Sequence, residues 1–282
     1  MLTIGVNTFL LTSPFTNESI DIIRQFKDWG SDAIEIALED ASHIDPHLIK
    51  RALDDNGLRC SSICAAMGPG RDLRGTKEEQ QNSIDYISQV LETMVLLDCP
   101  VLVGPLYSTV GRAEQTTDDD YKAQWDIVVK HMKTLAARAG DLGRKLAIEP
   151  LNRYETDFIN TCEQALKLTQ AVDHEVVGLL LDTYHMNIEE KDSAAAIRKA
   201  GKHLFHVHAC GCDRGAPGND HIDWVGIREA LKEVDYTGSL VIESFTPAVK
   251  VIAKAASIWR NFEPSREAIA VKGISFLRSH FA

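Results

Sequence analysis

The sequence lacks the features that would place the protein in a membrane or on nucleic acid. No stretch of 18 consecutive apolar residues occurs in its 282 residues, so no membrane span is expected. The first fifteen residues, MLTIGVNTFLLTSPF, have no basic region, so we expect no signal peptide and a cytoplasmic location. Basic residues are outnumbered, with 30 Lys and Arg against 41 Asp and Glu and a net charge of −11. Because nucleic acids and anionic membranes favour a basic face, we expect neither as a partner.

Two common motifs are also missing. The six cysteines follow no common zinc-site spacing. Without a secretion signal we expect them to be reduced and mostly buried; they are Cys60, Cys64, Cys99, Cys162, Cys210 and Cys212. The segment after the first apolar run, GVNTFLLTSPF, contains no glycine fingerprint of a dinucleotide-binding turn. A doubly wound open sheet, which usually carries that fingerprint, is therefore the less favoured α/β alternative.

Short apolar runs instead alternate with longer amphipathic ones along the whole chain. The apolar runs predict strands at Thr3–Phe9, Ala33–Ala37, Leu58–Cys64, Pro100–Gly104, Lys145–Glu149, Val176–Asp182, His203–His208 and Ser239–Glu243. The amphipathic runs predict helices at Ser19–Trp29, Pro46–Asn56, Lys77–Leu97, Asp118–Gly140, Cys162–Val172, Ser193–Ala200 and Trp224–Val234, with a helical tail from about Ala248. Glycines that could end helices in a left-handed conformation precede five of the strands: Gly30, Gly57, Gly143, Gly201 and Gly238. Eight β-α units in series predict one (β/α)8 TIM barrel spanning residues 1–282, with a helical C-terminal tail.

The last four predicted strands each end on a side chain that can bind a metal ion. LAIE ends at Glu149, GLLLD at Asp182, FHVH at His208 and LVIE at Glu243. In a barrel the carboxyl ends of these strands share one rim, so the four groups can converge. Three carboxylates and one imidazole favour Mn²⁺, with Mg²⁺ or Co²⁺ as alternatives. The competing interpretation is that acids follow strands simply because loops are polar.

Further polar side chains follow on the same predicted rim. Glu155, His185 and Arg214 lie six, three and six residues beyond three of the candidate ligands, in predicted loops. They suit hydrogen bonds to a small polar ligand, although they could also be ordinary surface charges. Glu35, at the end of the second predicted strand, could orient substrate or a histidine, or could pair with an arginine below the site.

A divalent ion between two carboxylates suits one reaction in particular. The ion would bind a ketone oxygen and the neighbouring hydroxyl, which acidifies the C–H between them and stabilises an enediolate. One glutamate would remove that proton while the other supplies a proton to the opposite face. Glu149 and Glu243, with the other two candidate ligands between them in the strand order, are the natural pair.

Four segments in this order, IEPLNRYET, LLDTYHMNIEE, HVHACGCDRGAPG and VIESF, resemble the ketose 3-epimerases. These are the D-tagatose, D-allulose (psicose) and L-ribulose 3-epimerases of the xylose-isomerase-like barrel superfamily. The resemblance spans nearly the whole chain and includes GPLYSTVGR and IWRNF. It implies a homodimer or homotetramer that uses Mn²⁺ or a related ion on an unphosphorylated ketose. By position it implies metal ligands at Glu149, Asp182, His208 and Glu243, an acid/base pair at Glu149 and Glu243, and contacts to substrate O1 to O3 from Glu155, His185 and Arg214.

The chain also departs from the common pattern of that family. NTFLLTSPF lacks the aromatic pair often found in the first loop, and Cys210-Gly211 stands where a Gly-Glu pair is common. In that family the first loop lines the far end of the sugar. The differences leave the length and stereochemistry of the substrate open, so a tetrulose or a modified sugar is also compatible. An aldose–ketose isomerase of the hydroxypyruvate or xylose type, a barrel-type endonuclease acting at abasic sites and a non-catalytic sugar-binding barrel are the alternative functions.

Overall fold

The computed structural model describes residues 2–114 and 116–281. Its eight parallel strands close into a barrel in chain order. Their bounds are β1 Thr3–Asn7, β2 Ala33–Leu38, β3 Arg59–Ala65, β4 Val101–Gly104, β5 Lys145–Ile148, β6 Val177–Asp182, β7 Leu204–His208 and β8 Ser239–Ile242. The barrel closes between its first and last strands, where Ile4 pairs with Leu240. The predicted (β/α)8 fold is confirmed.

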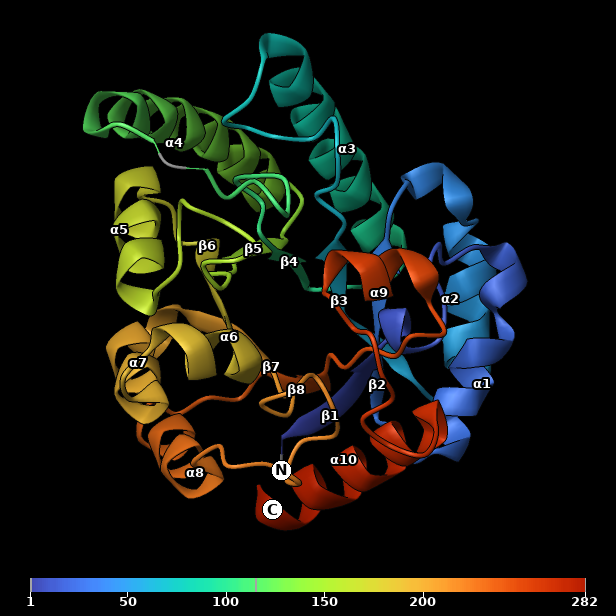
Figure 1. Cartoon of the computed structure of the whole chain (residues 1–282). Coiled ribbons are helices and arrows are strands. Elements are labelled where there is room, and N and C mark those ends of the chain that lie inside the picture. Colours follow the sequence, from blue (N-terminus) through green and yellow to red (C-terminus); the bar gives the residue numbers. More distant parts are fainter. Residues whose placement is uncertain (1, 115, 282) are drawn as a thin grey trace.

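The helices form a ring around this barrel (Figure 1). They are α1 Asp21–Asp28, α2 Pro46–Asp55, α3 Lys77–Leu96, α4 Asp118–Asp141, α5 Cys162–Val172, α6 Thr183–Glu189, α7 Ser193–Ala200, α8 Trp224–Glu233, α9 Lys250–Ala255 and α10 Arg266–His280, with short 3-10 turns η1 Thr8–Leu10, η2 Asn17–Ser19, η3 Ala41–His43 and η4 Gly201–His203. The predicted helical tail is α9 and α10. α10 packs against β1 and β8, whereas α9 lies over the end of the barrel.

The strands form because they are apolar on both faces and every face is covered. All six residues of β2 and all six of β6 are buried, as expected for strands between a barrel interior and a helical layer. Helices α2 to α8 and α10 begin at side-chain caps, whereas α1 and α9 do not. Thr76 and Thr161 each form a capping box, which satisfies backbone N–H groups at the start of α3 and α5.

The predicted helix ends need one correction. Four of the five glycines named above have positive φ, but Gly238 does not. Asp235 (φ 52°) takes the left-handed position after α8, because that helix already ends at Glu233. Gly238 lies directly before β8 instead.

Two expectations from composition can be compared with the structure. All six cysteines are free thiols, and five of them are buried, as predicted. Within residues 2–114 and 116–281, no helix combines the length and apolarity needed to cross a membrane.

Candidate metal centre and active site

Four ligand-type side chains meet at the carboxyl rim of β5 to β8. Asp182 and His208 are the last residues of β6 and β7, while Glu149 and Glu243 follow β5 and β8 by one residue. Each is at most 6% exposed. The predicted convergence of these four groups at one rim is therefore present in the fold.

The imidazole of His208 lies among the three carboxylates. Its Nδ1 is 3.3 Å from Glu243 Oε2, 3.7 Å from Glu149 Oε1 and 3.9 Å from Asp182 Oδ2. One ligand atom from each of the four side chains lies within 4.8 Å of the others. Glu149 Oε1 and His208 Nδ1 are buried without a hydrogen-bond partner. Buried polar atoms are rarely left unsatisfied, so this group fits a divalent cation that would bind them.

Glu35, on β2, holds the opposite nitrogen of the same imidazole. Its Oε1 lies 2.8 Å from His208 Nε2 and accepts from Asn7 Nδ2 at 2.7 Å. Its Oε2 lies 2.9 Å from His206 Nε2 and accepts from Ser62 Oγ at 2.5 Å. A proton on His208 Nε2 leaves Nδ1 free for a cation. The prediction that Glu35 could orient a histidine is confirmed. The alternative prediction, that Glu35 pairs with an arginine, is wrong.

The charges at the centre depend on one another. Burial disfavours the charged form of His208, but Glu35 and Glu243 outweigh it and raise the pKa of the imidazole well above its usual value. Burial raises the pKa of Glu149 to about 8, with His208 opposing. Burial also acts on Glu243, but there His208 prevails and the pKa is lowered. The raised pKa values of His208 and Glu149 favour their protonated forms, and a bound cation would compete with those protons.

Arg214 links two of the carboxylates to the substrate-facing side. Its Nη1 donates to Asp182 Oδ2 at 2.6 Å and to Glu243 Oε2 at 3.1 Å. Its guanidinium carbon lies 4.3 Å from the ring centre of Tyr184 and 4.8 Å from that of Phe245. Arg214 also adopts a left-handed backbone (φ 69°), which is uncommon for a residue with a side chain and is found mainly where surrounding contacts impose it. The predicted proximity of Arg214 to the centre is confirmed.

His185 joins the same group, but not from a loop. It lies on α6, which begins directly after β6 with Asp182 as its N-cap, so the prediction of a loop is wrong here. Its Nδ1 accepts from the backbone N–H of Asn152 at 3.0 Å, and its Nε2 is 3.0 Å from Arg214 Nη2. Burial and the charge of Arg214 lower the pKa of His185 well below its usual value, which keeps the ring neutral.

Glu155 lies in the loop after β5, as predicted. Its Oε1 accepts from Asn152 Nδ2 at 2.8 Å. Burial raises the pKa of this carboxyl, although Arg214 opposes that shift. His185, Glu155 and Arg214 therefore line one side of the cavity together with Glu149 and Glu243.

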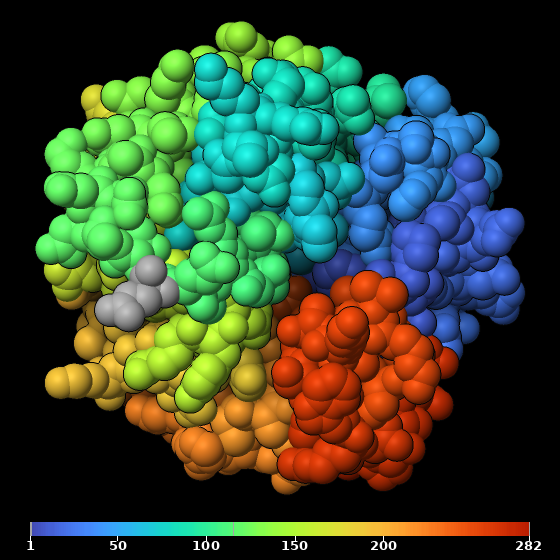
Figure 2. Space-filling model, turned by 45° about the horizontal axis from the view of Figure 1, so that its top comes forward, coloured from blue at the N-terminus to red at the C-terminus, as the bar shows by residue number. Residues whose placement is uncertain are grey.

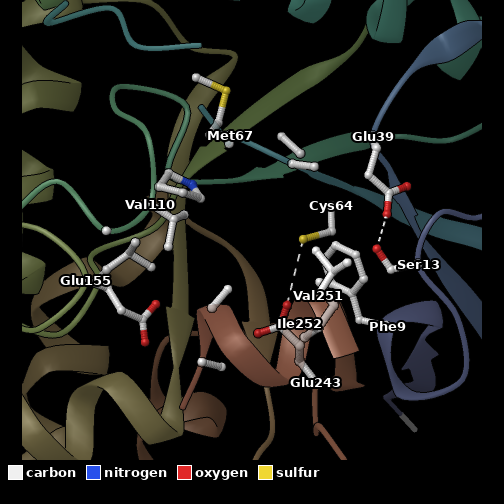
Figure 3. Close-up of a pocket in the computed structure, with 18 of the residues that line it drawn as sticks. Phe9, Ser13, Glu39, Cys64, Met67, Val110, Glu155, Glu243, Val251 and Ile252 are labelled. Atoms are coloured by element: carbon white, nitrogen blue, oxygen red, sulfur yellow. Dashed lines mark hydrogen bonds between the residues drawn. The ribbon is translucent and has the colours of Figure 1, made fainter. Parts of the chain in front are cut away.

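The cavity above the centre has a volume of about 650 Å³. It opens on the face of Figure 2, where the C-terminal segment faces the loops after β3, β4 and β5 across a hollow. Its lining includes four residues that the sequence did not single out: Phe9, Cys64, Met67 and Ile252 (Figure 3). Cys64 Sγ donates to Glu243 Oε1 at 3.7 Å. Cys64 lies in β3, whereas Phe9, Met67 and Ile252 lie in η1, in the loop after β3 and in α9. Apolar residues of this kind look like core residues in a sequence, so no local signal marked them as part of a site.

Comparison with known proteins places this chain in a family. The model of the xylose isomerase-like TIM barrel family matches residues 23–280. A probable ketose 3-epimerase of Synechocystis sp. is 36% identical over 280 residues, which cover 98% of this chain and 96% of the relative. This chain belongs to the ketose 3-epimerase family. The family resemblance predicted from the sequence is thereby confirmed.

Further members of the ketose 3-epimerase family agree with this assignment. The D-psicose 3-epimerase of Ruminiclostridium cellulolyticum is 32% identical over 245 residues, covering 85% of this chain and 82% of the relative. The crystal structure of a D-allulose 3-epimerase from Methylomonas sp. in complex with D-allulose superposes with a TM-score of 0.92 at 28% identity, covering 99% of this chain and 97% of that one. The family is one of carbohydrate isomerases, which confirms the predicted enzyme class.

Proposed function

We propose that this protein epimerises free ketoses at C3 through a cis-enediolate and uses a divalent cation, with Mn²⁺ as the favoured ion. The observation that carries the proposal is the set of four buried ligand atoms within 4.8 Å of one another, two of them from glutamates. Membership in the ketose 3-epimerase family supports the choice of C3. Mg²⁺ and Co²⁺ are the alternative cations, because all three suit an oxygen-rich set with one imidazole.

Glu149, Asp182, His208 and Glu243 would hold the cation. Once bound, it would supply a Lewis acid that makes the C3 proton of the ketose acidic and stabilises the negative charge that develops. Glu35 keeps His208 Nδ1 directed at the cation through the bond to Nε2. Arg214 Nη1, already bound to Asp182 and Glu243, fixes the direction of their carboxylates.

Glu149 and Glu243 are the acid/base pair. They follow β5 and β8, with Asp182 and His208 between them in the strand order, so they approach a ligand from different directions. In one direction of the reaction, one carboxylate takes the proton from C3 and the other carboxyl gives a proton to the opposite face. The proton count of the sugar is unchanged, and only the configuration at C3 inverts.

Glu155, His185 and Arg214 would hold the oxygens at the O1 to O3 end. His185 is kept neutral and Arg214 charged, so an imidazole and a guanidinium lie beside the position of the developing negative charge. The 650 Å³ cavity admits a small sugar directly above these groups. We also propose that residues 1–282 act as one barrel domain in a cytoplasmic homodimer or homotetramer, as the sequence resemblance implies.

A direct assay tests this function. The purified protein is incubated with Mn²⁺ and D-fructose, D-tagatose or L-ribulose, and the products are separated by chromatography. We expect the C3 epimer of at least one ketose, and we expect Glu243→Gln to abolish its formation. Conversion of a ketose to an aldose without any C3 epimer would instead support the aldose–ketose isomerase, which would use the same centre between C1 and C2.

A further inference from the structure

We propose that the pocket contains a second subsite, beyond the reacting centre, that binds a neutral, hydroxyl-rich group attached at the C6 end of the ketose. The preferred substrate would then be a glycosylated ketose. This inference rests on the proposed C3 epimerisation and specifies its substrate class. The subsite is defined by Ser13, Glu39, Asp40 and His43, which line the same cavity as the catalytic glutamates.

The cavity is larger than a free hexulose requires. Its volume is about 650 Å³. At about 30 Å³ per water molecule this is room for roughly twenty non-hydrogen atoms, against about twelve in a free hexulose. Sugar-binding pockets normally enclose most of their ligand. Because covalently bonded sugar atoms each take less volume than a free water molecule, the remaining space admits one additional sugar ring.

The direction of that space follows from the order of the side chains. In Figure 3, Glu155 and Glu39 lie on opposite sides of the pocket, with Glu243 between them. Glu155 is proposed to hold the O1 end, and Glu243 acts at C3. The chain of the ketose beyond C3 therefore extends toward Ser13 and Glu39, past Phe9.

The polar groups of this subsite suit hydroxyls. Ser13 Oγ donates to Glu39 Oε1 at 2.6 Å, so the two side chains are held together at the pocket wall (Figure 3). His43 lines the same cavity, and its buried Nδ1 has no hydrogen-bond partner among the described residues. Carboxylates and an imidazole can each accept a hydrogen bond from a sugar hydroxyl.

The same groups disfavour a phosphate at this position. Glu39 and Asp40 contribute two carboxylates, which repel an anion. The guanidinium of Arg71, which lines the same cavity, donates to the backbone oxygen of Ala66 at 3.0 Å and lies 3.9 Å from the ring centre of Tyr86. On the apolar side, Val251 and Ile252 of α9 offer a surface for the C–H face of a sugar ring. A neutral glycosyl group fits this combination.

The test compares three substrates with the Mn²⁺-loaded protein. They are D-fructose, 6-O-α-D-glucopyranosyl-D-fructose and D-fructose 6-phosphate, each assayed for C3 epimerisation. We expect kcat/KM for the glucosyl ketose to exceed that for D-fructose by about tenfold, as one or two added hydrogen bonds imply, and the phosphate to be the poorest substrate. If D-fructose is epimerised and kcat/KM for the glucosyl ketose is equal to or lower than that for D-fructose, this inference is overturned. The proposed C3 epimerase activity would still be supported.

Two variants locate the effect. Glu39→Ala and His43→Ala each lower the ratio of kcat/KM for the glucosyl ketose to that for D-fructose by about threefold, because each loses one of the acceptors for the added ring. The control Glu229→Gln, an exposed acid on α8, leaves the ratio within about twofold. An unchanged ratio in both subsite variants contradicts the inference. If none of the three ketoses gives a C3 epimer, the proposed C3 epimerase activity and this inference are both wrong.

Discussion

Glu35 determines how the only histidine among the proposed metal ligands faces the centre. Its two oxygens bind His208 and His206, and Ser62 and Asn7 donate to the same carboxylate. Burial would raise the pKa of Glu35, but the charge of His208 and hydrogen bonds to both histidines lower it well below its usual value. The carboxylate is thus ionised, and it can fix His208 with its proton on Nε2.

Glu35→Gln should weaken binding of Mn²⁺. The amide group of glutamine cannot accept from both histidines, so His208 loses its fixed orientation, and we expect the dissociation constant to rise about 10–100-fold. Isothermal titration with Mn²⁺ measures this directly, and the melting temperature shows whether the variant is folded. Glu229→Gln removes an exposed carboxylate as a control. A folded Glu35 variant with the affinity of the unaltered protein would show that the contact is only structural.

Metal binding should also depend on pH. The raised pKa values of His208 and Glu149, the latter about 8, mean that these groups hold protons near neutral pH that a cation must displace. Affinity should therefore rise with pH, by about tenfold per unit for each proton released. Titrations between pH 6 and 7.5 in buffers of different ionisation enthalpy count the released protons. Heats that do not depend on the buffer would show that no proton leaves.

The sequence predicted these rim residues and offered Glu35 as a partner of a histidine, but it did not indicate which histidine. Glu149, Asp182, His208 and Glu243 could be found because polar residues interrupt regular apolar runs. The contact between Glu35 and His208 joins residues 173 positions apart, and it exists only because the barrel brings β2 and β7 side chains to its axis. Nothing local in the sequence marks such a pair.

At the scale of elements, the centre depends on close contact between neighbouring strands. Gly178 of β6 lies against β7, where an added Cβ would be 2.5 Å from the backbone oxygen of His203 and from the ring of Phe205. The same two strands end in Asp182 and His208, which face the centre. The spacing of these two proposed ligands is therefore set by the packing of β6 on β7.

Gly178→Ala should lower the free energy of unfolding by about 1–3 kcal/mol, because backbone and ring must move to admit the methyl group. The midpoint of urea unfolding, followed by circular dichroism, measures the change. Gly68→Ala is the matched control, since no atom lies within 4 Å of a Cβ at that position. Equal urea midpoints for the two variants would mean that β6 and β7 can move apart without a loss of stability.

The elements differ in how well the sequence predicts them. The eight strands were found because both faces are apolar and the runs are short. α6 was missed because its seven residues, Thr183–Glu189, are too few to show a helical period. Its start is set by the Asp182 side chain accepting from the backbone N–H of Tyr184 at 2.7 Å, a contact that depends on where β6 ends.

At the scale of the whole molecule, the charge separates two functions that share this fold. An endonuclease needs a basic face to bind phosphates, whereas this chain carries a net charge of −11. We expect no measurable binding to a fluorescent duplex with an abasic site, at low or at high salt. Fluorescence anisotropy provides the measurement. Binding that weakens steeply with added salt would support the endonuclease instead.

The central claim is that Glu149 and Glu243 exchange the proton at C3 of a ketose. Epimerisation of D-fructose, or of the preferred ketose, in D₂O with Mn²⁺ tests it most directly, with proton NMR of the product. We predict that the epimer carries deuterium at C3 and none at C1, because the new proton comes from a carboxyl that exchanges with solvent. An epimer that keeps its original hydrogen at C3, or an aldose labelled at C2, would contradict the proposed mechanism.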